Sequence, residues 1–279
     1  MSTPIAPTRL LADQATAAAG LLTATIALAF ASTVASAADM PTPSPMRAPE
    51  PSVYQWTGCY VGANLGGGAS GTNFSSSVDP GTHLLGADPG VVAGAGGGGY
   101  NANGLLAGGQ AGCNLQFNTL VVGIEGDFDS FRSNPNFSNN TNTLSDGVTP
   151  FTISQSLTTN YLATVRPRLG IAADRNFAYL TGGIAFTSVS YAESYTDGAA
   201  PPGAGTASTS KSLIGWTAGA GWEYAFADHW TVRAEYLFTS FPSVNAVGLI
   251  TDAGGGSNTL RGSSDLVIQA VRAAVNFKF

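Results

Sequence analysis

Residues 213–241 read LIGWTAGAGWEYAFADHWTVRAEYLFTSF, and side chains of two chemical classes alternate along this stretch. In Leu213–Phe226 large apolar residues alternate with small or polar ones, and the same pattern returns in Trp230–Phe241. A period of two residues is typical of a strand whose two faces meet different surroundings. The residues between the two segments, Ala227–His229, are enough for a tight turn. This stretch therefore predicts an antiparallel hairpin.

The same alternation recurs outward from this hairpin in both directions. We expect eight strands, which are Trp56–Gly66, Leu105–Gln116, Leu120–Asp129, Tyr161–Ile171, Ala178–Tyr191, Leu213–Phe226, Trp230–Phe241 and Leu266–Phe279. Long and short connections alternate between them. The long ones are Gly67–Gly104, Ser130–Asn160, Ala192–Ser212 and Pro242–Asp265, and the short ones are Phe117–Thr119, Ala172–Phe177 and Ala227–His229. This rhythm is typical of an up-and-down barrel in an outer membrane, with four long extracellular loops and short periplasmic turns.

The two faces of each strand predict which side meets lipid. In Leu266–Phe279, Val275 and Phe277 share one face and Arg272 lies on the other. A Lys or Arg on the lipid face costs about 2–4 kcal/mol at mid-depth, so the charged face must line the lumen. Backbone polar groups in lipid must pair within the protein, so the sheet must close. We therefore expect the all-β class, as an eight-stranded antiparallel up-and-down transmembrane β-barrel. The rival fold is a soluble lipocalin-like barrel, with its apolar face inward and its charged face outward.

The charges inside the predicted strands indicate an ion network. Counted from the short turns, four acids and four arginines fall at similar heights on the lumen face. They are Glu125, Asp127, Glu223, Glu235, Arg166, Arg168, Arg233 and Arg272. An eight-stranded barrel is just wide enough for side chains to fill it. We expect these charges to cancel and to plug the lumen, and a narrow or gated pore is the alternative.

The composition and the N-terminal segment limit the functions that we expect of this chain. Of 279 residues only 10% are charged, and 11 Lys and Arg with a net charge of −6 argue against a nucleic-acid partner. Residues 1–37 are predicted to be a signal peptide, because the apolar run Gly20–Phe30 precedes small residues that fit a cleavage site. Residues 38–55 form a Pro-rich linker, and 56–279 form the barrel. The mature chain is expected in the outer membrane, in contact with its lipid.

Few residues suggest chemistry. Cys59 and Cys113 fall on the lipid face of neighbouring strands, and either a cross-strand disulfide or two free thiols fits this position. His83 in the first long loop and His229 in a short turn are expected to be solvated. The loop acids expected as scattered surface charge are Asp146, Glu193, Asp197 and Asp252. No Ser-His-Asp arrangement or metal-ligand spacing can be assembled, so we expect no enzyme activity and no cofactor.

Aromatic residues near the short turns, Trp56 among them, are expected at the membrane interface. The chain ends in Phe279 on an alternating apolar strand. Such an end resembles the signal that the outer-membrane assembly machinery reads, so Phe279 is a candidate for that role.

Several motifs carry a resemblance to a known family. They are WTGCYVGANLG at Trp56, GIEGDF at Gly123, TVRPRLG at Thr164, YLTGGIAF at Tyr179, GWTAGAGWEYAF at Gly215 and WTVRAEYLF at Trp230. In this order they resemble the porin-like, opacity-type surface-antigen family of alphaproteobacterial eight-stranded outer-membrane barrels. The resemblance covers Trp56–Phe279, and Pro167 departs from the family pattern.

This resemblance implies a structural or antigenic outer-membrane protein without a cofactor. We expect a monomer that contributes to envelope integrity and displays its loops. The alternatives are a small porin for hydrophilic solutes and an adhesin that binds a host or other extracellular ligand through those loops.

Overall fold

The computed structural model describes residues 53–279. The predicted signal peptide, residues 1–37, and the linker up to residue 52 lie outside the described residues. The elements are β1 (Gly58–Val78), α2 (Asp88–Ala95), β2 (Gly98–Phe117), β3 (Leu120–Ser133), β4 (Asn136–Thr143), β5 (Pro150–Ala173), β6 (Asn176–Asp197), β7 (Gly203–Ala225), β8 (Trp230–Asp252) and β9 (Ser257–Lys278). Over the described range, none of the helical structure is long and apolar enough to cross a bilayer.

The strands close into a ring. Their order is β3-β2-β1-β9-β8-β7-β6-β5-β4, and every pairing is antiparallel. A further pairing of β3 with β5 joins the two sides of this order. The ring has eight strands, because β4 only extends the sheet along the part of β5 that β3 does not reach. The predicted eight-stranded antiparallel barrel is thus confirmed.

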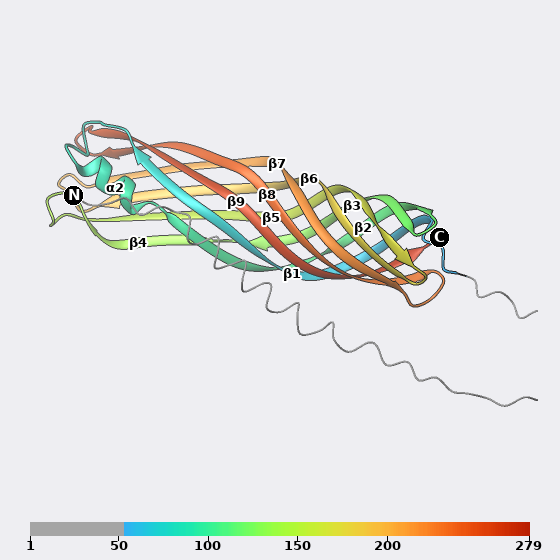
Figure 1. Cartoon of the computed structure of the whole chain (residues 1–279). Coiled ribbons are helices and arrows are strands. Elements are labelled where there is room, and N and C mark those ends of the chain that lie inside the picture. The colour runs from blue at the N-terminus through green and yellow to red at the C-terminus, as the bar shows by residue number, and fades with distance from the viewer. Residues whose placement is uncertain (1–52) are drawn as a thin grey trace, which may run out of the picture. The chain divides into compact units, whose positions relative to one another are not determined.

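Three short turns lie together at one end, which we call the turn end, and the C-terminus lies there too (Figure 1). The turns are Asn118–Thr119, Asp174–Arg175 and residues 226–229, as the sequence predicted. Asn118 and Asp174 have φ angles of 56° and 49°, a left-handed conformation that Asn and Asp side chains tolerate better than most. Outer-membrane barrels place such turns on the periplasmic side. We call the opposite end the loop end.

The prediction of four long loops is wrong, because most of those residues belong to strands. The expected loop Ala192–Ser212 shrinks to residues 198–202, and the expected loop Pro242–Asp265 shrinks to residues 253–256. Within Ser130–Asn160 the chain forms β4 and the first half of β5. Only the β1–β2 connection, residues 79–97, stays long, and it contains α2. The barrel therefore extends far beyond its predicted height (Figure 1).

In the part of the strands that extends beyond the predicted segments, apolar and polar side chains exchange faces. Ala163, Phe186 and Ile214 lie side by side on the outer face of β5, β6 and β7. Between this row and the turn end, which we call the lower barrel, apolar side chains face outward and charged ones inward. Beyond the row, in the upper barrel, most outward positions, such as Ser190, are polar and most inward ones, such as Val189, are apolar. Leu105 in β2 and Val247 and Leu249 in β8 are exposed apolar exceptions. The upper barrel thus has the polarity expected of the rival lipocalin-like fold, and only the lower barrel has that of a membrane protein.

A bulge in β5 marks the change. Its pairing with β6 shifts register between Thr159 and Ala163. Inward residues have odd numbers before the bulge, as at Leu157, and even numbers after it, as at Leu162. Inside the upper barrel a continuous apolar core includes Phe74, Leu106, Phe131, Ile153, Tyr195, Ile250 and Leu260. Leu84 and Val92, from the β1–β2 connection, are buried in this core.

Candidate functional site in the barrel interior

The structure brings all eight predicted lumen residues together in the lower barrel, and each of their side chains is buried. Arg166 stands at the centre of the cluster. Its Nη2 atom lies 2.8 Å from Oε1 of Glu125 and 2.8 Å from Oδ2 of Asp127. Its Nη1 atom lies 3.3 Å from Oε1 of Glu235. One guanidinium therefore joins acids from two strands, β3 and β8.

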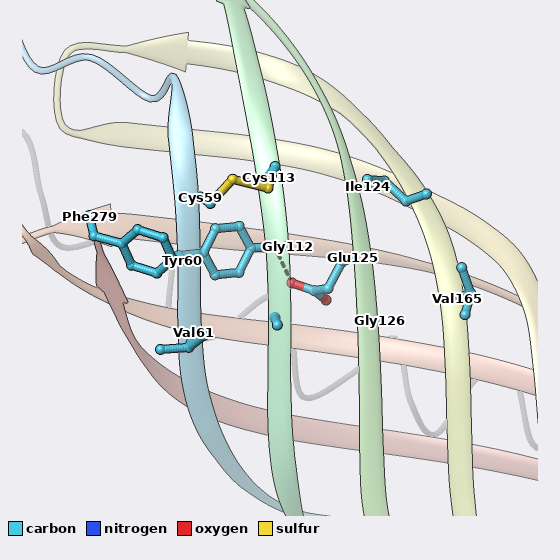
Figure 2. Close-up of a pocket in the computed structure, with 11 residues that line it drawn as sticks. Cys59, Tyr60, Val61, Gly112, Cys113, Ile124, Glu125, Gly126, Val165 and Phe279 are labelled. Atoms are coloured by element: carbon cyan, nitrogen blue, oxygen red, sulfur yellow. Dashed lines mark hydrogen bonds between the residues drawn. A yellow bond between two sulfur atoms is a disulfide. The ribbon is translucent and has the colours of Figure 1, made fainter.

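Arg168 links the cluster to the turn end. Its Nη2 atom lies 2.7 Å from Oε2 of Glu223, and its Nη1 atom lies 3.0 Å from Oε2 of Glu125. The guanidinium lies over the ring of Tyr179, 4.4 Å from its centroid, in a cation–π contact. Tyr60 donates a hydrogen bond to Glu125 at 2.5 Å (Figure 2). Sequence reasoning missed both tyrosines, although each falls on a lumen-facing position.

Arg272 contacts more acidic residues than any other arginine of the cluster. Its Nη1 atom lies 2.7 Å from Oδ2 of Asp129 and 3.1 Å from Oδ1 of Asp127. Its Nη2 atom lies 2.7 Å from Oε2 of Glu235. The eighth predicted residue, Arg233, pairs with Glu125. Asp129, the last residue of the predicted strand Leu120–Asp129, was not among the eight predicted lumen residues, but it is buried in the cluster. The expected balance of four against four is therefore wrong: five buried carboxylates face four guanidinium groups.

The lumen is also closed at the turn end. Trp56 is 1% exposed and packs on Phe177 with ring centroids 5.1 Å apart. Its Nε1 atom donates to the backbone oxygen of Asp174 at 3.0 Å. The expectation that Trp56 lies at the membrane interface is wrong, because its ring lies inside the barrel. Together with Tyr54 and Val121 it forms an apolar layer beneath the charged cluster.

At the loop end His83 is held between two acids. Its Nε2 atom lies 2.7 Å from Oδ2 of Asp197, and its Nδ1 atom lies 2.7 Å from Oδ2 of Asp252. The His83 side chain is only 4% exposed, so its expected solvation is wrong. Burial opposes a charged ring, but the hydrogen bonds and charges of both acids outweigh it and raise the pKa of His83 above its ordinary value. The two acids, expected as scattered surface charge, thus bind the β1–β2 connection to β6 and β8.

Glu193 was also expected on the surface, and it is buried in the upper core. Burial raises the pKa of its carboxyl, although hydrogen bonds from Ser76 at 2.6 Å, Tyr191 at 3.0 Å and Gln155 at 3.2 Å oppose the shift. Gln155 also donates to the backbone oxygen of Gly96, just past the end of α2, at 3.0 Å. The hydrogen bonds of Gln155 therefore connect the end of α2 to the barrel wall. Asp146 stays exposed, as expected.

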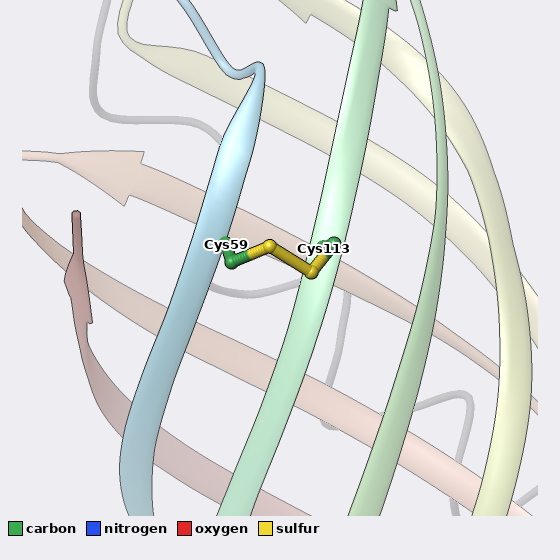
Figure 3. The surroundings of a disulfide bond; sticks show 2 residues. All are labelled: Cys59 and Cys113. Carbon is green, nitrogen blue, oxygen red and sulfur yellow. A yellow bond between two sulfur atoms is a disulfide. The ribbon is translucent and has the colours of Figure 1, made fainter.

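Two predicted residues lie on the outer face of the lower barrel. Cys59 and Cys113 are directly opposite each other in the β1–β2 register and form a disulfide (Figure 3). Of the two alternatives that the sequence left open, the structure contains the bonded one. Phe279 donates its backbone N–H to the oxygen of Cys59 at 3.1 Å, and the residue is 68% exposed. Figure 2 places Phe279 and the disulfide on the same side of the barrel end.

Comparisons with known proteins agree with this architecture. Residues 23–279 match the outer membrane protein β-barrel domain family. The 31 kDa outer-membrane immunogenic protein of Brucella melitensis is 33% identical over 93% of this chain and 99% of its own length. The 25 kDa outer-membrane immunogenic protein of Brucella abortus is 27% identical over 86% of this chain and 85% of its own.

Among solved structures, the outer membrane protease OmpT from Escherichia coli aligns with a TM-score of 0.40 and 8% identity, over 82% of this chain and 99% of its own. OprG from Pseudomonas aeruginosa aligns with a TM-score of 0.38 and 12% identity, over 81% of this chain and 99% of its own. These structural likenesses are weak, and the family match rests on the sequence. The chain belongs to the outer membrane protein β-barrel domain family and is an outer-membrane protein.

Proposed function

We propose that this protein is a closed structural barrel that contributes to envelope integrity and does not conduct solutes. The observation that carries the proposal is the filling of the lumen at three levels. Trp56 and its neighbours occupy the turn end, the carboxylate–guanidinium cluster occupies the lower barrel, and apolar side chains with Leu84 and Val92 occupy the upper barrel. A water path through the barrel would have to displace side chains from all three layers.

We further propose that the monomer displays its loop end at the cell surface. The names of the two Brucella relatives describe them as immunogenic, which supports surface exposure for a chain similar to them over most of its length. Hydrophilic outward residues of the upper barrel suit a position above the lipid.

Conductance of purified protein in planar lipid bilayers tests the closed barrel. Wild-type protein is expected to give no stable openings under conditions in which a general porin, as positive control, conducts. Leu84→Ala with Val92→Ala trims only two side chains from the filling of the upper barrel and is expected to stay silent, because the remaining apolar core and the charged cluster still fill the lumen. Large, stable openings from wild-type protein would contradict the proposal and favour the small porin.

Phe279 is proposed as the residue that the assembly machinery recognises. Its exposure directly after β9 supports this role. Deleting Phe279 should lower the fraction of heat-modifiable, assembled protein in cells severalfold. The same variant should refold from urea into detergent as well as wild type does, because it loses one exposed side chain and one backbone hydrogen bond. Normal assembly of the deletion variant in cells would refute the role.

A further inference from the structure

The sheet is not closed over its full height. The pairing of β2 with β3 ends at Leu106 and Phe131, and in the described chain β2 has no pairing with β4. The Cα atoms of β2 and β4 lie more than 8 Å apart at nearly every position, whereas neighbouring strands of a sheet are about 4.8 Å apart. A slit therefore separates Gly98–Leu105 of β2 from β4 in the upper barrel.

Side chains close the slit on its inner side. Tyr100 of β2 and Phe137 of β4 lie on the inward faces of their strands, with ring centroids 4.8 Å apart. Both rings are only partly buried against the upper core. At the loop end the backbone N–H of Ser145, in the β4–β5 turn, donates to Asp88 of α2 at 2.9 Å. The slit is thus a bounded site with an apolar floor and a strand edge on either side.

The β1–β2 register shows which backbone groups of β2 point into the slit. The backbone oxygen of Cys59 accepts from Phe279, on the side away from β2, so Cys59 and Cys113 form a non-hydrogen-bonded pair of the ladder. The register continues unbroken to the loop end, and such pairs alternate with hydrogen-bonded ones. Gly99, Asn101 and Asn103 therefore turn their N–H and C=O groups away from β1, where no strand of the described chain pairs with them.

The edge of β2 lacks the usual protection against a further strand. Exposed edges in natural proteins commonly carry Lys, Pro or a bulge, which discourage pairing with another chain. Gly98–Leu105 contains no charged residue and no proline, and its pairing with β1 has no irregularity. The facing strand β4 also lacks charge and proline, but its register shifts between Asn139 and Asn142. The edge of β2 is therefore the more regular of the two.

The chemistry of this edge selects the class of partner. Alternating backbone donors and acceptors in one line are matched by the backbone of an extended polypeptide, which adds a strand to the sheet. Each of β1 and β5–β9 already has a paired neighbour on both sides, so none of these strands is left over to fill the slit. The partner strand therefore comes from a different polypeptide.

We propose that the slit is a docking site for an extended, uncharged segment of another protein, which adds to β2 as an antiparallel strand. This strand continues on β2 the antiparallel pairing that β3 makes as far as Leu106. Its inward side chains are apolar and pack on Tyr100 and Phe137, whereas its outward side chains are polar. With the loop end outward, as proposed above, the partner lies outside the cell. The site is separate from the filled lumen.

A synthetic peptide of eight alternating Thr and Val residues, with a fluorophore and a polyethylene glycol tail, serves as the probe. Fluorescence anisotropy measures its binding to the folded, full-length protein in detergent. Apolar Val faces inward, so the Thr residues lie opposite the outward residues of β2 and direct their N–H groups at its edge. N-methylation of the Thr residues should weaken binding by about fivefold or more, and N-methylation of the Val residues by less than about twofold.

Two variants at one position separate backbone from side chain. Asn101→Pro removes an N–H group that points into the slit and no bond to β1, and should weaken binding by about fivefold. Asn101→Ala keeps the N–H group and should bind as wild type does. Heat-modifiable migration verifies that both variants are folded.

Three results would overturn the proposal. The first is a lack of saturable binding of the probe to wild-type protein. The second is an equal loss of affinity in the two Asn101 variants, because the site would then read the side chain. The third is self-association of the protein that Asn101→Pro abolishes, because a second copy would then occupy the edge.

Discussion

At the scale of the residue, the excess of acid in the lumen makes Arg272 critical. Arg272 is the cation that contacts Asp129 within the described chain, and it also contacts Asp127 and Glu235. Removing one member of a buried ion pair leaves the other charge uncompensated, which costs about 3–5 kcal/mol. The effect should be severe at Arg272, where the cluster already holds more carboxylates than guanidinium groups.

Arg272→Met is therefore expected to lower the free energy of unfolding by about 3–5 kcal/mol. Asp129→Asn serves as the matched variant. It leaves four carboxylates facing four guanidinium groups and keeps a hydrogen-bonding side chain, so it should cost about 1 kcal/mol or less. Reversible urea unfolding in lipid vesicles measures both. Equal losses for the two variants would show that the acid excess does not matter.

The members of this cluster were predictable because strand periodicity fixes which side chains face the lumen. Glu125, Asp127 and Asp129 alternate on one strand and share a face. Asp129 lies on the same face but at the end of the predicted segment, and it was not counted in the predicted network. The aromatic partners were missed for another reason: alternation places Tyr60 inside, but the Glu125 it binds comes from a strand two positions away.

At the scale of the element, strands were found only where their outward residues are apolar. In β6 the outward residues change from Ile184 and Phe186 to Ser188 and Ser190, and the predicted boundary falls near this change. From the sequence alone, a segment in which Ser alternates with Val is easily mistaken for a polar loop. The sequence does not show that the inward residues of such a segment share a core. The bulge in β5 adds to the difficulty, because it shifts the inward positions by one residue.

The β1–β2 connection is expected to respond to pH through His83. Both ring nitrogens of His83 face carboxylates, Asp197 from β6 and Asp252 from β8, and Tyr195 hydrogen-bonds Asp197 at 2.8 Å. Two acceptors require two N–H donors, so the pairing favours the charged imidazolium. The raised pKa means that the folded protein holds this proton more tightly than the unfolded chain does. The stabilisation is complete below about pH 6.5 and is lost as the pH rises through the higher folded-state pKa.

Residues 79–97 should therefore open more readily at alkaline pH. Opening measured by hydrogen exchange, after correction for intrinsic rates, should increase by up to about tenfold per pH unit between about pH 6.5 and the higher folded-state pKa of His83, and it should level off above that pKa. His83→Gln should open more at acidic pH than wild type and show little dependence on pH. An identical pH profile in both proteins would rule out His83 as the titrating group.

At the scale of the whole molecule, two barrels of opposite polarity share one set of strands. The lower barrel exposes Ile184 and Val165 to lipid and hides its charges, whereas the upper barrel hides Ile153 and exposes serines. The outer face of the sheet is therefore mainly apolar at the height of the lipid and mainly polar above it. Pairing of β3 with β5 closes the ring, and the polarity of the outward side chains then follows the solvent that surrounds each part of it.

A lysine placed at two heights on the outer face of β6 tests this division. Ile184→Lys lies among lipid-facing side chains and should lower the free energy of unfolding in lipid vesicles by about 2–4 kcal/mol. Thr196→Lys lies on the same face near the loop end, where water surrounds it, and should change the free energy by less than about 0.5 kcal/mol. In short-chain detergent, whose micelle lets water approach, the Ile184 penalty should shrink. If both lysines cost the same in vesicles, the membrane boundary does not lie at the row of Ala163, Phe186 and Ile214.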